Sequence, residues 1–231
     1  MDEESLTAAI ANSVHWYDAV MSAHGLAVEH RKNAWLCKEK VPPFYSNMIT
    51  LDRFGSQGPL ITEIGSTLLR PWTIKDSYNS IDLVERGFDV LFDAEWFGRS
   101  PDQNWPSRTG QAPPVQTVRS ESELERWVEA WGETPIGRPV FVPGLLQNDE
   151  VEFVYVDRGS YVSAGLVANR SDDVIGITNA FGSPREVMNC IHHLSHRYDL
   201  AVVGYGRKRQ VEFLTGFGFR QIGKLRIWIN R

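Results

Sequence analysis

The sequence contains little of what secreted, metal-binding and membrane proteins depend on. Its 231 residues include two cysteines, Cys37 and Cys190, which lie far apart and outside any Cys-x-x-Cys or Cys/His spacing. This excludes a disulfide framework and a structural zinc site. No apolar run approaches the length of a membrane span, and the first residues are acidic where a secretory signal is basic. We therefore expect a cytoplasmic protein without a membrane partner or a metal site.

An excess of positive charge is also absent. The chain has 24 Lys and Arg against 29 Asp and Glu, a net charge of -5, and a pI near 5.7. This balance gives the molecule no general affinity for nucleic acid, so proteins or small molecules are the expected partners. With 42% hydrophobic residues, the chain can bury the core of one large domain or two small ones. Its many aromatic residues predict bulky core packing and one aromatic-walled pocket.

Hydrophobic periodicity predicts alternating helices and strands in the first half of the chain. Leu6, Ile10, Val14 and Tyr17 recur at helical spacing, and Gly25 follows the end of the run. The expected elements are a helix at 4–23, strands at 26–29, 34–37 and 48–51, a helix at 59–69 and a strand at 88–97.

Two stretches of this half leave their role open. In the loop at 42–47, paired prolines precede Phe44 and Tyr45, whose rings either line a site or fill the core beside a rigid connector. The second stretch, Lys75-Asp76-Ser77, gathers reactive side chains, but no histidine is near in sequence to activate the serine. We interpret it as an Asp/Ser turn or a helix cap.

Residues 100–120 are rich in Pro, Ser, Gln, Asn and Arg and form the predicted linker. After a helix at 121–131 and an extended or mixed stretch at 139–146, three β-rich runs predict an antiparallel meander. The hydrophobic period then changes from two to 3.6, which predicts a crossover helix, a strand, a second helix and a closing strand. The result is a mixed α/β sheet. From the meander onward the elements are expected at 150–156, 160–169, 174–181, 184–198, 201–204, 207–215 and 221–229.

This order of elements resembles the fold of the GCN5-related N-acetyltransferase (GNAT) superfamily. The hairpin at 165–181, the helix at 184–198 and the stretch Leu214-Thr-Gly-Phe-Gly218-Phe219 carry the resemblance. It implies a GNAT-like core over residues 121–231. The element order of residues 1–99 resembles a degenerate second copy, so two GNAT-like halves in tandem, joined by the linker at 100–120, are the expected domain organisation.

The resemblance also implies acetyl-CoA as cofactor. In the family, two parallel strands splay apart, the cofactor lies between them, and free amides at the start of the crossover helix hold its pyrophosphate. Phe181, Gly182 and Ser183 are the corresponding residues and the expected cofactor-binding loop. The loop departs from the family pattern, because Ser183 and Glu186 form a Ser-x-x-Glu capping box with Pro184 at the first helical position. That cap gives the helix amides internal partners.

The family's general-acid tyrosine is also replaced. Its position holds Leu214 here, and the helix-start asparagine of the family corresponds to Arg207. Tyr205 is near enough in sequence to act as the acid instead, and Glu152 on the first strand of the meander is the candidate base. Glu95 is a second candidate for the base.

A basic cluster indicates an anionic ligand. Arg207, Lys208 and Arg209 stand at the start of a predicted helix, where the helix dipole disfavours cations, and a bound anion would relieve that cost. These three residues therefore join the expected cofactor site, with solvated side chains on an outer helix as the alternative. His192 and His196 are one helical turn apart, but the apolar stripe puts His196 on the opposite face and no carboxylate follows as in His-Glu-x-x-His, so we expect a solvated helix face and no metal site.

The sequence leads to two functional hypotheses. The first is an atypical acyl-CoA-dependent N-acetyltransferase-like enzyme that transfers an acetyl group to a small-molecule or protein amine. The second is a catalytically inactive binding or scaffold protein with the same fold, and a homodimer is left open for both. The strands at 174–181 and 201–204 distinguish them. Divergence of these strands favours the enzyme, whereas a closed sheet plugged by Phe181 or Tyr205 favours the scaffold.

Overall fold

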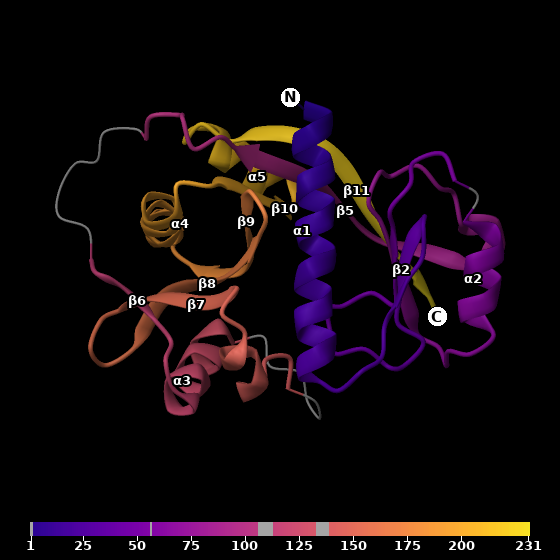
Figure 1. Cartoon of the computed structure of the whole chain (residues 1–231), viewed down its shortest axis with the longest axis horizontal. Coiled ribbons are helices and arrows are strands. Elements are labelled where there is room, and N and C mark those ends of the chain that lie inside the picture. Colours follow the sequence, from indigo (N-terminus) through magenta and orange to yellow (C-terminus); the bar gives the residue numbers. More distant parts are fainter. Residues whose placement is uncertain (1, 56, 106–112, 133–138) are drawn as a thin grey trace.

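The computed structural model describes residues 2–55, 57–105, 113–132 and 139–231. Within these ranges, five α-helices pack on one mixed sheet of eleven strands (Figure 1). The predicted mixed α/β class is confirmed. The helices are α1 (Asp2–Ala23), α2 (Gly58–Gly65), α3 (Glu121–Trp131), α4 (Pro184–Tyr198) and α5 (Lys208–Thr215).

The strands follow one another through the whole described chain. The first half contributes β1 (Glu29–His30), β2 (Ala34–Leu36), β3 (Met48–Thr50), β4 (Trp72–Asp76) and β5 (Phe88–Arg99). The second half contributes β6 (Val115–Thr117), β7 (Val151–Asp157), β8 (Val162–Ser171), β9 (Val174–Gly182), β10 (Ala201–Gly206) and β11 (Arg220–Asn230). Two short 3-10 helices occupy Val84–Arg86 and Pro143–Gln147.

The two halves exchange their last strands. In each half, a helix connects two parallel strands: α2 joins β3 to β4, and α4 joins β9 to β10. The strand that ends the first half, β5, lies between β10 and β11 and is antiparallel to both. The strand that ends the second half, β11, lies between β5 and β4. The spatial order β3-β4-β11-β5-β10-β9 is therefore continuous, and each half completes the sheet of the other.

Helix α1 ties the halves together from one face of the sheet. It crosses the middle of the molecule (Figure 1) and contacts β8, β9, β10, β5 and β11. Its predicted apolar stripe is buried, with Ile10, Tyr17 and Val20 each less than 5% exposed. A helix with this stripe gains about 25 cal/mol for each Å² of apolar surface removed from water. Its polar residues Asn12 and Ser13 are also buried, so they face the sheet as well.

An aromatic cluster forms the core under α3. Trp127 makes edge-to-face contacts with Phe141, Phe153 and Phe181, at ring-centroid distances of 5.4, 5.1 and 5.0 Å. Its indole N–H donates to the carbonyl of Val154 at 3.2 Å, so the buried ring leaves no unpaired polar group. This cluster fixes β9 against α3 at the place where β9 approaches its end.

The structure differs from expectation in the first half and in the predicted linker. Residues 72–76 form the strand β4, which the sequence reasoning missed because it read this stretch only as a turn. The predicted turn follows directly after this strand. There the carboxylate of Asp76 accepts hydrogen bonds from the backbone amides of Ser80 and Ile81, at 2.8 and 3.0 Å. Strand β6 lies within the predicted linker, of which residues 106–112 lie outside the described ranges. The domain boundaries themselves stay a prediction.

Candidate functional site

Strands β9 and β10 separate halfway along their length. They pair from Val174 and Ala201 to Ile177 and Gly204, and the pairing ends there although both strands continue. The register between β8 and β9 skips Asn179 and Ala180, and Asn179 adopts a left-handed φ of 51°. This β-bulge bends β9 away from β10, as bulges do.

A cleft of about 640 Å³ opens where the strands part. Its walls come from β9, β10, α4 and α5. They are mostly apolar and include Ile177, Val187, Met188, Ile191, Phe213 and Leu214. Arg209 and Gln210 at the start of α5 line the same cleft, opposite Gly182 and Pro184 before and at the start of α4. One cleft therefore combines an apolar wall with a cation.

One half of the predicted capping box of α4 is present: the Ser183 side chain caps the helix, and no described bond runs from the Ser183 backbone amide to the Glu186 carboxylate. The Ser183 hydroxyl accepts a hydrogen bond from the backbone amide of Glu186 at 3.4 Å and donates one to its carboxylate at 3.2 Å. Arg158 pairs with the Glu186 carboxylate. The negative charge that Glu186 brings to this helix start therefore has a cationic partner on the β7–β8 turn.

Of the three basic residues at the start of α5, one lines the cleft. Arg209 belongs to the lining, and Arg207 and Lys208 do not. The side chain of Lys208 is 76% exposed and lies 3.9 Å from Glu212, while Arg207 lies over the ring of Phe92. The backbone amide of Arg207 donates to Gln210 at 2.8 Å, which caps the helix internally.

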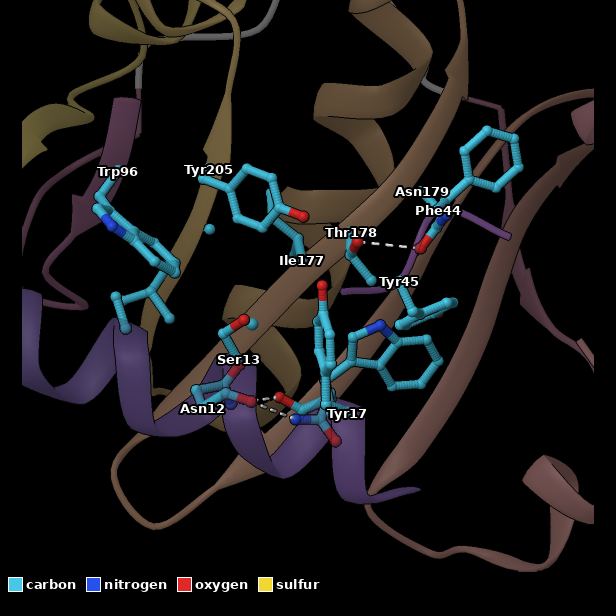
Figure 2. Close-up of a pocket in the computed structure, with 16 residues that line it drawn as sticks. Asn12, Ser13, Tyr17, Phe44, Tyr45, Trp96, Ile177, Thr178, Asn179 and Tyr205 are labelled. Carbon is cyan, nitrogen blue, oxygen red and sulfur yellow. Dashed lines mark hydrogen bonds between the residues drawn. The ribbon is translucent and has the colours of Figure 1, made fainter. Parts of the chain in front are cut away.

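A smaller, deeper pocket of about 90 Å³ continues from the cleft (Figure 2). We call it the inner pocket. Both spaces are lined by Phe44, Ile177, Thr178, Asn179 and Tyr205, so they meet at the point where β9 and β10 part. The described lining of the inner pocket contains no Asp, Glu, Lys or Arg. Its walls are aromatic rings and neutral polar groups from α1, the loop after β2, β5, β8, β9 and β10.

The polar wall of the inner pocket is held by hydrogen bonds between α1 and β8. The amide of Asn12 donates to the Asn169 carbonyl at 2.9 Å and to the Ser171 hydroxyl at 2.7 Å. Asn169 returns a bond to the Asn12 carbonyl at 3.2 Å, and within the described part of the chain its own Oδ1 has no partner. Asn169 is 1% exposed, so its Oδ1 is a buried acceptor without a described partner on a residue that lines the inner pocket.

Lys75 lies behind the inner pocket, fully buried on β4. Its Nζ donates a hydrogen bond to the Ser13 hydroxyl at 2.7 Å. The rings of Tyr205, Trp96 and Tyr17 surround it, with centroids 3.9, 4.8 and 5.3 Å from Nζ. It makes no ion pair with a described carboxylate. Burial therefore lowers the pKa of Lys75 well below its ordinary value of 10.5.

Tyr205 lines both the cleft and the inner pocket, so it stands at their junction. Figure 2 shows its ring among the residues that line the inner pocket. Its ring packs edge to face on Trp96 at 5.3 Å. Burial, with a smaller contribution from Tyr17, raises the pKa of Tyr205 above its ordinary value of 10.0. The phenol is therefore protonated at neutral pH and can donate a proton or a hydrogen bond into the site.

Three other predicted residues, Glu152, Phe181 and Glu95, lie outside the described lining of the cleft and of the inner pocket. Glu152 lies outside the described lining of both spaces, and its buried carboxylate accepts hydrogen bonds from Arg197 at 2.8 Å and from Tyr198. The ring of Phe181 packs on Trp127 and does not line the cleft, so Phe181 does not plug the gap between the strands. Glu95 pairs in register with Gly206 and Lys224 and is absent from both linings.

The two aromatic residues of the loop at 42–47 have different roles: one fills the core and the other lines the site. Tyr45 is 7% exposed and packs on Tyr17 at 5.0 Å, as a core residue does. Phe44 is 61% exposed, has a left-handed φ of 73°, and lines both the cleft and the inner pocket. Positive φ is costly for a bulky side chain and concentrates at functional positions. Phe44 thus forms part of the rim.

Comparisons with known proteins place this geometry in a fold. No family model matches the sequence, and no curated protein matches it. Solved structures do: a GCN5-related N-acetyltransferase from Kribbella flavida is 9% identical, with a TM-score of 0.63 over 96% of this chain and 95% of that one. A protein assigned to the GNAT family from Novosphingobium aromaticivorans is 12% identical, with a TM-score of 0.56 over 91% and 94% of the two chains.

A third similar structure is described as a functionally unknown conserved protein from Staphylococcus epidermidis. It is 10% identical to this chain, with a TM-score of 0.57 over 87% of this chain and 92% of that one. In all three comparisons the similarity covers both halves of the chain. At these identities the similarity concerns the backbone architecture. The chain therefore has the fold of the GCN5-related N-acetyltransferases.

Proposed function

We propose that this protein is an atypical acyl-CoA-dependent N-acetyltransferase-like enzyme that transfers an acetyl group from acetyl-CoA to a small amine. The observation that carries the proposal is the parting of β9 and β10 at Ile177 and Gly204, where an apolar cleft meets the uncharged inner pocket. A donor in the cleft and an acceptor in the inner pocket meet at Tyr205.

The chemistry of the cleft suits a CoA thioester. The apolar wall from Val187 to Leu214 matches the pantetheine arm, and Arg209 supplies a positive charge for its phosphates. The Ser183 cap occupies a helix-start amide that a pyrophosphate would otherwise use. We therefore expect micromolar or weaker binding of acetyl-CoA, with Arg209 as the main contact to its phosphates.

The reaction uses the two spaces together. The amine nitrogen attacks the thioester carbonyl, a C–N bond forms, and the C–S bond breaks. The leaving thiolate takes a proton from the Tyr205 hydroxyl, which lies at the junction. Asn169 Oδ1 accepts a hydrogen bond from the amine and holds it for attack. Since acetyl-CoA is an intracellular metabolite, the proposal implies a cytoplasmic protein. Among the described residues no helix is long and apolar enough to cross a membrane.

A binding or scaffold role is the second candidate, and the Ser183 cap and Leu214 favour it. Calorimetric titration with acetyl-CoA, combined with a thiol-release assay, distinguishes the two. The enzyme is expected to bind acetyl-CoA and release free CoA in the presence of an amine. A protein that binds acetyl-CoA without releasing CoA is the scaffold, and absence of binding at millimolar concentration rules out the proposed donor.

Two variants of α5 sharpen the titration. Arg209→Ala removes the cation that lines the cleft and is expected to weaken acetyl-CoA binding about tenfold, as the loss of one phosphate contact does. Lys208→Ala removes an adjacent cation that points to solvent and serves as the matched control. Equal effects of the two substitutions would show that only general charge matters, and would argue against a donor seated in the cleft.

A further inference from the structure

A hydroxyl of the inner pocket wall is paired with a buried amine behind it, and neither group takes part in the reaction proposed above. Ser13 lines the pocket from α1, and its Oγ lies 2.7 Å from Nζ of Lys75 on β4. The two residues are 62 positions apart in the sequence and meet only because α1 packs across the sheet. A hydroxyl within hydrogen-bond reach of a lysine amine is the arrangement found in serine–lysine catalytic pairs.

The surroundings of Lys75 favour its neutral form at rest. The residue is fully buried, the described part of the chain offers no carboxylate to it, and desolvation lowers its pKa. The titratable groups that face Nζ are Tyr17 and Tyr205, and burial raises the pKa of both, that of Tyr17 to about 12. Both phenols are therefore neutral near pH 7, and the lysine has no anionic neighbour that would hold a proton on it.

The same surroundings tolerate a cation that forms briefly. The faces of Tyr205, Trp96 and Tyr17 lie 3.9 to 5.3 Å from Nζ, within the range of cation–π attraction. Ser13 Oγ accepts a hydrogen bond from the protonated amine. Lys75 can thus accept a proton during a reaction and release it afterwards, which is what a general base requires.

We propose that Ser13 and Lys75 form the proton-accepting pair of the inner pocket, with Ser13 taking the proton from the attacking amine while it passes its own to Lys75. This inference rests on the proposed function and adds the base that the reaction needs. As the C–N bond forms, one proton leaves the amine nitrogen for Ser13 Oγ, and the Ser13 hydroxyl proton moves to Nζ. Tyr205 meanwhile protonates the thiolate. Solvent returns the proton from Lys75 to Tyr205 when the products leave. Ser13 is the catalytic residue, and Lys75 acts through it.

The size and the uncharged lining of the inner pocket indicate the class of the acceptor. The inner pocket holds about 90 Å³ and its described lining carries no charge, so it fits a short, uncharged carbon chain that ends in one amine. Because the pocket lacks a carboxylate in its described lining, a second ammonium group in the acceptor would lose its hydration without gaining a partner. We therefore use propylamine as the acceptor in the test.

The direct test is the titration of Lys75 in the free protein, by NMR of lysine labelled with ¹³C and ¹⁵N. The signal is assigned by its absence in Lys75→Met. The expected result is a titration midpoint well below the ordinary value of 10.5. A Lys75 that titrates near 10.5 overturns the inference, whatever the donor does.

The kinetic test follows CoA release from acetyl-CoA with propylamine between pH 6 and 10. We expect the wild-type rate, divided by the concentration of unprotonated propylamine, to rise with pH up to the pKa measured for Lys75. Ser13→Ala and Lys75→Met are expected to lower kcat about 100-fold and to abolish that inflection, with acetyl-CoA affinity unchanged. Ser22→Ala, an exposed serine on the same helix, is the control and keeps the wild-type profile.

The outcomes separate the two levels of inference. If the wild type binds acetyl-CoA and acetylates propylamine, but the variants keep its pH profile, only the role of Ser13 and Lys75 is overturned. If the wild type binds acetyl-CoA and leaves propylamine unchanged, the assignment of the amine to the inner pocket falls. If acetyl-CoA does not bind at all, the proposed function itself fails, and the failure is seen before any variant is compared.

Discussion

Nζ of Lys75 lies 3.9 Å from the centre of the Tyr205 ring. The lysine belongs to β4 in the first half of the chain, and the tyrosine belongs to β10 in the second. Each half thus supplies one member of this pair beside the inner pocket, and α1 adds Ser13. A first half that merely supported the second would not need a buried lysine at this point, because burying an amine without a counter-ion costs stability.

That cost predicts an unusual dependence of stability on pH. The unfolded chain binds a proton at Lys75 below about pH 10.5, and the folded chain binds it only below its lowered pKa. Between these values the unfolded state holds more protons, so Lys75 destabilises the fold increasingly as the pH falls, by about 1.4 kcal/mol per unit. Lys75→Met is expected to remove this slope and to be more stable than the wild type at pH 7.

Urea denaturation at several pH values between 6 and 9 measures the effect. Lys208→Met, on an exposed lysine, is the control and is expected to leave the curve unchanged. A Lys75→Met protein that is less stable than the wild type at every pH would mean that the amine makes a stabilising interaction in the fold, which contradicts a neutral, desolvated Lys75.

Tyr205 gives a second prediction, on turnover. Tyr205→Phe keeps the ring on Trp96 and removes only the hydroxyl at the junction. We expect kcat for CoA release to fall about 100-fold while the affinity for acetyl-CoA stays the same, because a general acid acts mainly in the transition state. Steady-state kinetics with propylamine separates the two parameters.

Leu214 provides the matching gain-of-function test. It lines the cleft on α5 at the position that corresponds to the acid of the resembled family. In the Tyr205→Phe background, adding Leu214→Tyr is expected to raise kcat for CoA release about tenfold over that of Tyr205→Phe alone. Leu214→Phe in the same background is the control, with a ring of similar size and no hydroxyl. Equal rates for these two double variants would show that a hydroxyl at 214 cannot reach the leaving group.

Phe44 predicts a third effect, in which stability and binding change in different ways. Its backbone has a φ of 73°, and its ring is largely exposed at the rim of the site. Phe44→Gly removes both the ring and the backbone strain, whereas Phe44→Ala removes the ring alone. We expect the glycine variant to be more stable than the alanine variant by about 1 kcal/mol.

Both Phe44 variants should raise the KM for acetyl-CoA by a similar factor, because both open the junction of the cleft and the inner pocket. Thermal denaturation and steady-state kinetics report the two quantities on the same samples. A KM that stays at the wild-type value in both variants would make Phe44 a surface residue without a part in the site.

The uncharged inner pocket gives a fourth prediction, on acceptor choice. Propylamine and 1,3-diaminopropane have the same carbon chain and differ by one amine. Because the described lining of the inner pocket holds no carboxylate, the second ammonium of the diamine is left without a partner there. We expect kcat/KM to be at least tenfold higher for propylamine. A preference for the diamine would place the acceptor elsewhere, near acidic side chains.

The sequence predicted the second half of the fold well, because each element there carries its own signal. The Ser183 cap, Pro184 and the apolar stripe of α4 predict its extent, and the expected 184–198 coincides with the observed Pro184–Tyr198. The run now seen as β11 was expected at 221–229 and spans Arg220–Asn230. In contrast, β4 was missed, since a central strand with Lys75 and Asp76 in its interior does not alternate between apolar and polar residues.

The site was predictable only in outline. The parting of two strands, Tyr205 and Arg209 followed from local patterns and from the resemblance. The pairing of Ser13 with Lys75 did not, because nothing in a sequence specifies which of several polar residues on α1 will face a strand 62 positions away. One signal was present: Ser13 shares the buried face of α1 with Val14 and Tyr17, and a buried hydroxyl needs a partner.

The exchange of β5 and β11 has a consequence for synthesis of the protein. As the chain leaves the ribosome from its N-terminus, β4 and β5 emerge about half a chain length before β11, their shared neighbour. Until Arg220–Asn230 has been made, both strands expose unpaired edges rich in backbone donors and acceptors. We therefore expect stalled or truncated chains that lack β11 to aggregate or to be bound by chaperones, because the first half cannot close its sheet alone.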